Sequence, residues 1–266
     1  MPPASSAASG PSDADPLPRT PPADRPGGPS GADGPAAARE GGPASGRRSD
    51  RVPRAFALWV DLVGGFLVLT DPTVVLGGGS ASSGPDHVVV EGSLLPQHLR
   101  LRRDSEGTVR VEPVPDRTGA LAPVAVGRER IDGPVALADG QQIVCEASMP
   151  YGRATRMTFH QPPSLSFSAR LSFPQFERIM PYFDGLILMG SSLVIGPQEG
   201  ALVRIPHWPR EAAIPKLTLV AREGRLTLHA EGPVWVDDRP ATGPTPVTIP
   251  CHVAGPTFSL SLAPLA

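Results

Sequence analysis

The sequence predicts an all-β protein, and two observations lead to that prediction. The chain has 266 residues with 35 prolines and 29 glycines, but only 5% of its residues are aromatic. This balance favours turns and short strands over long helices. After residue 54 the chain consists of short apolar or alternating runs, such as FALWV, GGFLVLT and HLRLRR, separated by glycine, proline and aspartate. Such runs with turn residues between them are typical of a β-sandwich or barrel.

The first 54 residues have a different composition. They are mostly Pro, Ala, Gly, Ser and Asp with scattered Arg, and their only large aliphatic side chains are Met1, Leu17 and Val52. A segment of this kind cannot bury enough apolar surface to offset the entropy lost on ordering. We therefore expect a disordered Pro/Ala/Gly-rich tail over 1–54, which serves as a solvated spacer or, through Thr20 in RTPP, as a phosphoacceptor.

An internal repeat divides the remainder of the chain. Four pairs of segments follow one another in the same order: 61–79 and 182–200, 95–113 and 214–231, 123–133 and 233–243, 141–147 and 247–253. The period of about 110 residues indicates a duplicated domain. We predict three parts after the tail: a β-sandwich over 55–160, a connecting segment with a strand over 161–181, and a second sandwich over 182–266.

Two smaller patterns refine this prediction. In SLSFSARLSF (164–173) apolar residues recur at every second position, which places five side chains on one face of a strand: Leu165, Phe167, Ala169, Leu171 and Phe173. Cys145 and Cys251 fall at matching positions of the aligned repeats, so we interpret them as buried small hydrophobes, not as disulfide partners.

Charge and hydropathy exclude several partner classes. The net charge is −2 and the pI is about 6.3, so no basic footprint for nucleic acid is present. The longest apolar stretch, 56–69, is interrupted by Asp61 and is shorter than the about 20 residues that span a bilayer. The first residues lack the basic and apolar regions of a signal peptide. We expect a cytoplasmic protein that binds neither membrane nor nucleic acid.

Signatures of catalysis are missing from the sequence. It contains no G-x-S-x-G, no P-loop and no dinucleotide-binding glycine pattern, and its six histidines are dispersed without metal-ligand spacing. The sequence therefore predicts a protein that is not an enzyme and that has no cofactor or metal.

The order of short motifs in the first repeat resembles the forkhead-associated (FHA) family. An early glycine is followed by apolar strands that end in Gly77, by DHVVVEG, by a histidine that opens HLRLRR, and then by VGRERI and LADGQQI. The last of these, Leu137 to Ile143, matches the family's L-x-D-G-x-x-I turn. The second repeat has a weaker version of this order. The resemblance covers nearly all of 55–266 and implies two tandem FHA-like β-sandwiches, a recognisable domain followed by a diverged copy.

The resemblance also implies where a phosphothreonine peptide would bind, because the family reads it with Gly-Arg, Ser-Arg-x-His and Asn-Gly loops at one end of the sandwich. Here Gly-Arg has become Gly77-Gly78, the second block runs from Leu95 to His98 and keeps only the histidine, and the third is Val126-Gly127. The family's histidine braces neighbouring loops and does not touch the phosphate. In the second repeat the corresponding residues are Gly196, Lys216 and Asp237.

These departures weaken the expected phosphate site. The chain contains no asparagine, so no other alignment restores that contact. Loss of an arginine, a serine and an asparagine removes on the order of 5 kcal/mol, since a hydrogen bond to a charged group contributes about 1.5–3 kcal/mol. We expect an FHA-type protein-interaction module for signalling or scaffolding, with impaired or absent phosphothreonine recognition and a protein or peptide partner.

Two alternatives stay open. In the first, relocated cations read a phosphopeptide: Arg128 and Arg130 follow Gly127, and alternation places Arg100 and Arg102 on one side of a strand. In the second, the chain is a carbohydrate-binding or envelope-associated sandwich, which requires neighbouring exposed tryptophans among Trp59, Trp208 and Trp235.

Overall fold

The computed structural model describes residues 51–79, 87–146, 152–163, 166–174, 178–180, 182–206 and 214–265. Within these residues the secondary structure is made of strands in three sheets, without a helix, so the all-β prediction is confirmed. The predicted tail lies outside the described residues except for residues 51–54.

The strands fall into two sets with the same order of pairings. The first set is β1 (Ala55–Val60), β2 (Gly64–Leu69), β3 (Thr73–Gly77), β4 (His87–Val89), β5 (Leu99–Arg103), β6 (Val109–Pro113), β7 (Val124–Val126), β8 (Glu129–Ile131), β9 (Val135–Ala136), β10 (Gln142–Cys145) and β11 (Thr155–His160). The second set is β12 (Ala169–Ser172), β13 (Gly185–Leu188), β14 (Ser192–Gly196), β15 (Val203–Arg204), β16 (Leu217–Arg222), β17 (Arg225–Ala230), β18 (Trp235–Val236), β19 (Arg239–Pro240), β20 (Thr245–Val247), β21 (Cys251–Ala254) and β22 (Ser259–Pro264). For example, β3 pairs in parallel with β4 and antiparallel with β5, as β14 does with β15 and β16.

The two sets exchange their first hairpins. The largest sheet has the order β19-β18-β21-β22-β1-β2-β13-β12-β11-β10-β7-β8. Hairpin β1–β2 of the first set therefore pairs with β22, the last strand of the second set, and hairpin β12–β13 of the second set pairs with β11. The two hairpins meet along a parallel pair of strands, in which Phe66 lies opposite Gly185. Neither repeat completes this sheet with its own strands alone.

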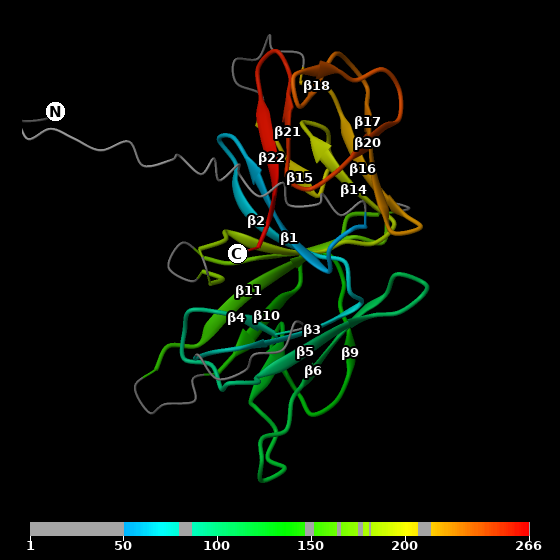
Figure 1. Ribbon diagram of the computed structural model, residues 1–266. Coiled ribbons are helices and arrows are strands. Elements are labelled where there is room, and N and C mark those ends of the chain that lie inside the picture. The colour runs from blue at the N-terminus through cyan, green and yellow to red at the C-terminus, as the bar shows by residue number, and fades with distance from the viewer. Residues whose placement is uncertain are drawn as a thin grey trace, which may run out of the picture. The chain divides into compact units, whose positions relative to one another are not determined.

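Each half of the long sheet is covered by a smaller sheet. The first sandwich consists of the β4-β3-β5-β6-β9 sheet and the half of the long sheet that faces it, β13-β12-β11-β10-β7-β8. The second sandwich consists of the β15-β14-β16-β17-β20 sheet and the other half, β19-β18-β21-β22-β1-β2. Figure 1 shows the two small sheets on opposite sides of the long sheet. Each sandwich has its own core: Leu101, Phe159 and Leu186 belong to the first, and Leu58 and Leu219 to the second.

The two central strands serve both cores. Leu67 on β2 faces the first core and Val68 faces the second, because successive side chains of a strand point to opposite faces. On β13, Leu186 and Ile187 divide in the same way. A strand buried on both faces has a continuous apolar sequence, which explains FLVL and LIL in the two repeats.

The segment predicted to connect the sandwiches is part of the long sheet. Its strand, β12, lies between β11 and β13, and Ala169 and Leu171 face the first core as predicted. The prediction that Phe167 shares this face is wrong. Its φ of 52° is left-handed, and the ring is 40% exposed. The backbone turns at this residue, so the period-two alternation does not extend to it.

The predicted equivalence of the two cysteines is also wrong. They lie on corresponding strands, β10 and β21, but at different positions. Ile143 on β10 pairs with Val126 on β7, and Val253 on β21 pairs with Val236 on β18, so Ile143 and Val253 correspond. Cys145 follows Ile143, whereas Cys251 precedes Val253. Both cysteines are buried as predicted, one in each core, and they are not disulfide partners.

Candidate functional site

The glycines at the end of β3 occupy places that leave no room for a side chain. A Cβ on Gly77 would overlap the carbonyl oxygen of Pro96, and a Cβ on Gly78 would lie 2.6 Å from the carbonyl oxygen of Leu94. The Gly78 N–H donates to the Leu95 oxygen at 2.8 Å. An arginine at position 78 would require this backbone to move. The Gly-Gly pair therefore packs two loops together and presents no cation.

His98 braces the neighbouring loop. Its side chain is fully buried. The Leu95 N–H donates to Nδ1 at 3.2 Å, so the ring proton lies on Nε2, which donates to the Pro123 oxygen at 3.3 Å. Burial lowers the pKa of His98 and keeps the imidazole neutral. Both ring nitrogens are thus engaged by backbone, and the residue holds the loop before β5 against the start of β7.

The third predicted loop lies elsewhere on the sandwich. Gly127 has a φ of 63° and forms the turn between β7 and β8 with the exposed Arg128, while Arg130 is exposed on β8. His98 contacts Pro123, at the start of β7, whereas this turn follows the end of that strand. The structure thus brings together Gly77, Gly78, Leu95 and His98 but places the two arginines at the other end of β7.

The corresponding residues of the second sandwich have structural partners. Lys216 Nζ forms an ion pair with Glu231 at 2.5 Å. Asp237 has a φ of 48° in the turn between β18 and β19, and its Oδ1 accepts the His252 N–H at 2.9 Å. A Cβ on Gly196 would lie 2.5 Å from Gln198 Oε1. These residues shape turns and loops and do not form an anion site.

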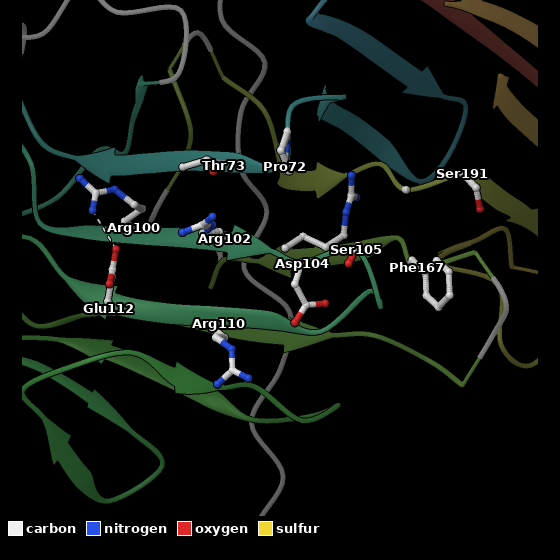
Figure 2. A pocket seen from close by; sticks show the side chains of 12 residues that line it. Pro72, Thr73, Arg100, Arg102, Asp104, Ser105, Arg110, Glu112, Phe167 and Ser191 are labelled. Carbon is white, nitrogen blue, oxygen red and sulfur yellow. Dashed lines mark hydrogen bonds and ion pairs between the residues drawn. The ribbon is translucent and has the colours of Figure 1, made fainter. Parts of the chain in front are cut away.

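A groove lies elsewhere, over the outer face of β5 and β6. Its volume is about 980 Å³, and four arginines contribute to its lining together with two carboxylates and an aromatic ring: Arg100, Arg102, Arg103, Arg110, Asp104, Glu112 and Phe167. Figure 2 shows Arg100 and Glu112 near one end of the groove and Phe167 near the other. Cationic and apolar groups therefore line a single depression.

The arginines of the groove have different partners. Arg100 Nη1 forms an ion pair with Glu112 Oε1 at 2.8 Å, and Arg103 donates to the Leu188 carbonyl oxygen at 3.1 Å. Burial lowers the pKa of the Arg103 guanidinium. Arg102 and Arg110 lie directly opposite each other on β5 and β6, and no carboxylate among the described residues pairs with either. These two exposed cations are the groups available to a ligand.

The sequence pattern identified only part of this groove. It placed Arg100 and Arg102 on one side of β5 but missed Arg110 and Phe167. The Asp-Ser-Glu-Gly turn in RRDSEGTVRVEP could have revealed Arg110, because pairing the strands across this turn puts Arg110 opposite Arg102. Phe167 offered no such signal, since its exposure depends on a local reversal of backbone conformation.

The tryptophans do not form a platform in the described residues. Trp59 on β1 and Trp235 on β18 are 42% and 40% exposed, but β21 and β22 lie between their strands. The Trp59 ring also contacts Phe183, with ring centroids 5.4 Å apart. Trp208 lies outside the described residues. The pair of adjacent exposed tryptophans that the carbohydrate alternative requires is not formed by Trp59 and Trp235.

The described residues contain no group of three or more His, Cys, Asp or Glu that could hold a metal ion, and no helix that is long and apolar enough to cross a membrane. Comparison with known protein families, with curated proteins and with solved structures finds no match.

Proposed function

We propose that this chain is a protein-interaction module without catalytic activity, an FHA-type pair of sandwiches whose loop end does not read phosphothreonine. The observation that carries the proposal is the packing at Gly78. The space in which a phosphate-binding arginine would begin is taken by the Leu94 carbonyl group, 2.6 Å from a Cβ at this position.

The chemistry of the neighbouring residues supports the same proposal. Recognition of a phosphate requires several charge-assisted hydrogen bonds to replace its hydration. His98 is buried and has both ring nitrogens bound to backbone atoms. Neither Gly77 nor Leu95 has a side chain that donates a hydrogen bond. A loop end with these residues offers too few donors for a dianionic group.

A calorimetric titration with matched phosphothreonine and unmodified peptide libraries tests this function. We expect no preference for the phosphorylated library. The matched variants are Arg128→Gln and Arg130→Gln, which remove the exposed cations of the turn between β7 and β8. A preference for phosphothreonine peptides that either variant abolishes would replace this proposal with the alternative of a phosphopeptide reader with relocated arginines.

A further inference from the structure

We propose that the groove over β5 and β6 of the first sandwich binds an acidic segment of a partner protein, and that Arg102 and Arg110 pair with its carboxylates. The proposal rests on the protein-interaction function and names the chemistry of the partner. It places binding on the outer face of a sheet, away from the loop end formed by Gly77, Leu95 and His98.

The two arginines form an arrangement that is unfavourable without a ligand. They are direct cross-strand neighbours, and like charges in this position destabilise a sheet. The carboxylates of the groove are already engaged. Glu112 pairs with Arg100, and Asp104 Oδ1 accepts the N–H groups of Glu106 and Thr108 at 3.0 and 2.9 Å. Anionic groups from another chain would complete the pairing that this face lacks.

The fold itself does not require these arginines. In the second sandwich, the same strand pair places Val220 opposite Thr227, and Thr218 opposite His229. The register is otherwise equivalent, with alternating leucines facing the core from both strands. The second sandwich is thus an internal control: it builds the same hairpin with uncharged residues at the positions of Arg102 and Arg110.

One end of the groove is apolar. Phe167 is 40% exposed beside Gly107, where an added Cβ would overlap the aromatic ring. The glycine therefore lets the ring lie against the turn between β5 and β6. Phe167 also has a left-handed φ of 52°, a strained conformation for an aromatic residue. We infer that the acidic segment carries an apolar residue that contacts this ring.

The donors left to a ligand suit carboxylates. The backbone N–H groups of Glu106 and Thr108 are bonded to Asp104 and are not available. The planar guanidinium groups of Arg102 and Arg110 can each donate two parallel hydrogen bonds to a carboxylate.

Fluorescence anisotropy of the full chain tests the proposal. The probe is a labelled peptide with a block of glutamates next to a leucine. We expect Arg102→Gln and Arg110→Gln each to weaken binding about tenfold, the effect of one charge-assisted contact. Arg128→Gln and Arg130→Gln, which change exposed arginines of the same sandwich, should leave binding unchanged. Phe167→Ala should remove the advantage of the leucine over a peptide that lacks it.

Several outcomes would overturn the proposal. They are a failure of the wild-type chain to bind the glutamate peptide, equal losses in both pairs of arginine variants, and binding of a phosphoserine peptide or of duplex DNA without binding of the glutamate peptide. Failure here is distinguishable from failure of the proposed function. Unmodified library peptides that bind regardless of Arg102 would leave the interaction function standing, whereas a phosphothreonine preference that depends on Arg128 would contradict that function.

Discussion

The two sandwiches have equivalent strands but different surfaces and different loop ends. On the outer face of β5–β6, Arg102 lies opposite Arg110, whereas the same place on β16–β17 has Val220 opposite Thr227. The residue just before β5, His98, is buried and bonded to backbone atoms, whereas the residue just before β16, Lys216, lies at the surface in an ion pair. Both hairpins keep alternating aliphatic side chains that face the core, leucines and valines in β5–β6 and leucines in β16–β17. The comparison teaches that apolar alternation specifies this sandwich, and that the positions around it are free to diverge.

The first and largest prediction concerns the shared central strands. Leu186→Ala removes a fully buried side chain from the first core, so the free energy of unfolding should fall by about 2–5 kcal/mol. Because the hairpins are exchanged, the second sandwich should unfold in the same transition. Tryptophan fluorescence in a Trp59→Phe, Trp208→Phe background measures this, since Trp235 lies on β18 of the second sandwich whereas the Trp59 ring contacts Phe183 of the first core.

A matched substitution makes this test decisive. Leu265→Ala changes a residue that is 40% exposed and should leave the transition close to that of the wild type. If Leu186→Ala shifted circular dichroism but not tryptophan fluorescence, the two sandwiches would be independent, and the exchange of hairpins would not couple them.

The second prediction concerns the turn after β3. Gly77→Ala places a methyl group against the Pro96 carbonyl, which is backbone and cannot move alone, so we expect a loss of about 3 kcal/mol. Gly133→Ala is the control, because nothing lies within 4 Å of a Cβ there. Chemical denaturation measures both changes. Equal small effects would show that the loops of the first sandwich are not tightly packed.

The third prediction compares corresponding residues of the two loop ends. His98→Gln removes two buried hydrogen bonds and should cost about 2 kcal/mol, whereas Lys216→Gln removes an ion pair at the surface and should cost under about 1 kcal/mol. Thermal unfolding of the two variants measures the difference. Similar losses would contradict the distinction between a buried brace and an exposed pair.

The burial of His98 also predicts that the free energy of unfolding depends on pH. Its folded pKa is lowered below the ordinary value of 6.5, so the unfolded chain binds the proton more readily. The stability that neutral His98 contributes is complete above the ordinary pKa of 6.5. It falls as the pH decreases from 6.5 toward the lower pKa of the folded state. Denaturation series between neutral pH and about pH 5 should show a smaller loss for His98→Gln than for the wild type. Identical slopes would exclude His98 as a contributor.

The fifth and smallest prediction exchanges the surface of one sandwich for that of the other. The double variant Arg102→Val and Arg110→Thr should raise the free energy of unfolding by about 0.5 kcal/mol, because a repulsive cross-strand pair is removed. The gain should shrink at high salt. Arg100→Thr, which breaks the pair with Glu112, is the control and should lower stability slightly. A loss in the double variant would mean that the arginines stabilise the fold.

The sequence was sufficient for the fold class and for the repeat, because alternating leucines and glycine turns are local signals. It was not sufficient for the exchange of hairpins. Strand β1, AFALWV, is apolar at every position, and such a strand fits beside β11 as well as beside β22. Only the three-dimensional pairing of Leu58 with Leu262 distinguishes these alternatives.

The candidate site was predictable where it depended on strand periodicity and not where it depended on loop conformation. Alternation located Arg100 and Arg102, and hairpin pairing could have located Arg110. The resemblance grouped Arg128 with His98, but the length of β7 separates them. Phe167 was predicted to share a strand face with Ala169 and Leu171 because apolar residues alternate there, and the left-handed backbone at that one residue reverses its direction.

The exchange of hairpins has a consequence for the order of synthesis. Phe56 on β1 pairs with Val68 on β2 and with Pro264 on β22, so β1 gains its second neighbour only when β22 has left the ribosome. Most domains fold in turn as they are made. Here a chain that stops before β22 leaves β1 as an open apolar edge, which is a template for aggregation. The first strand is therefore protected only in a chain that has been made through its last strand.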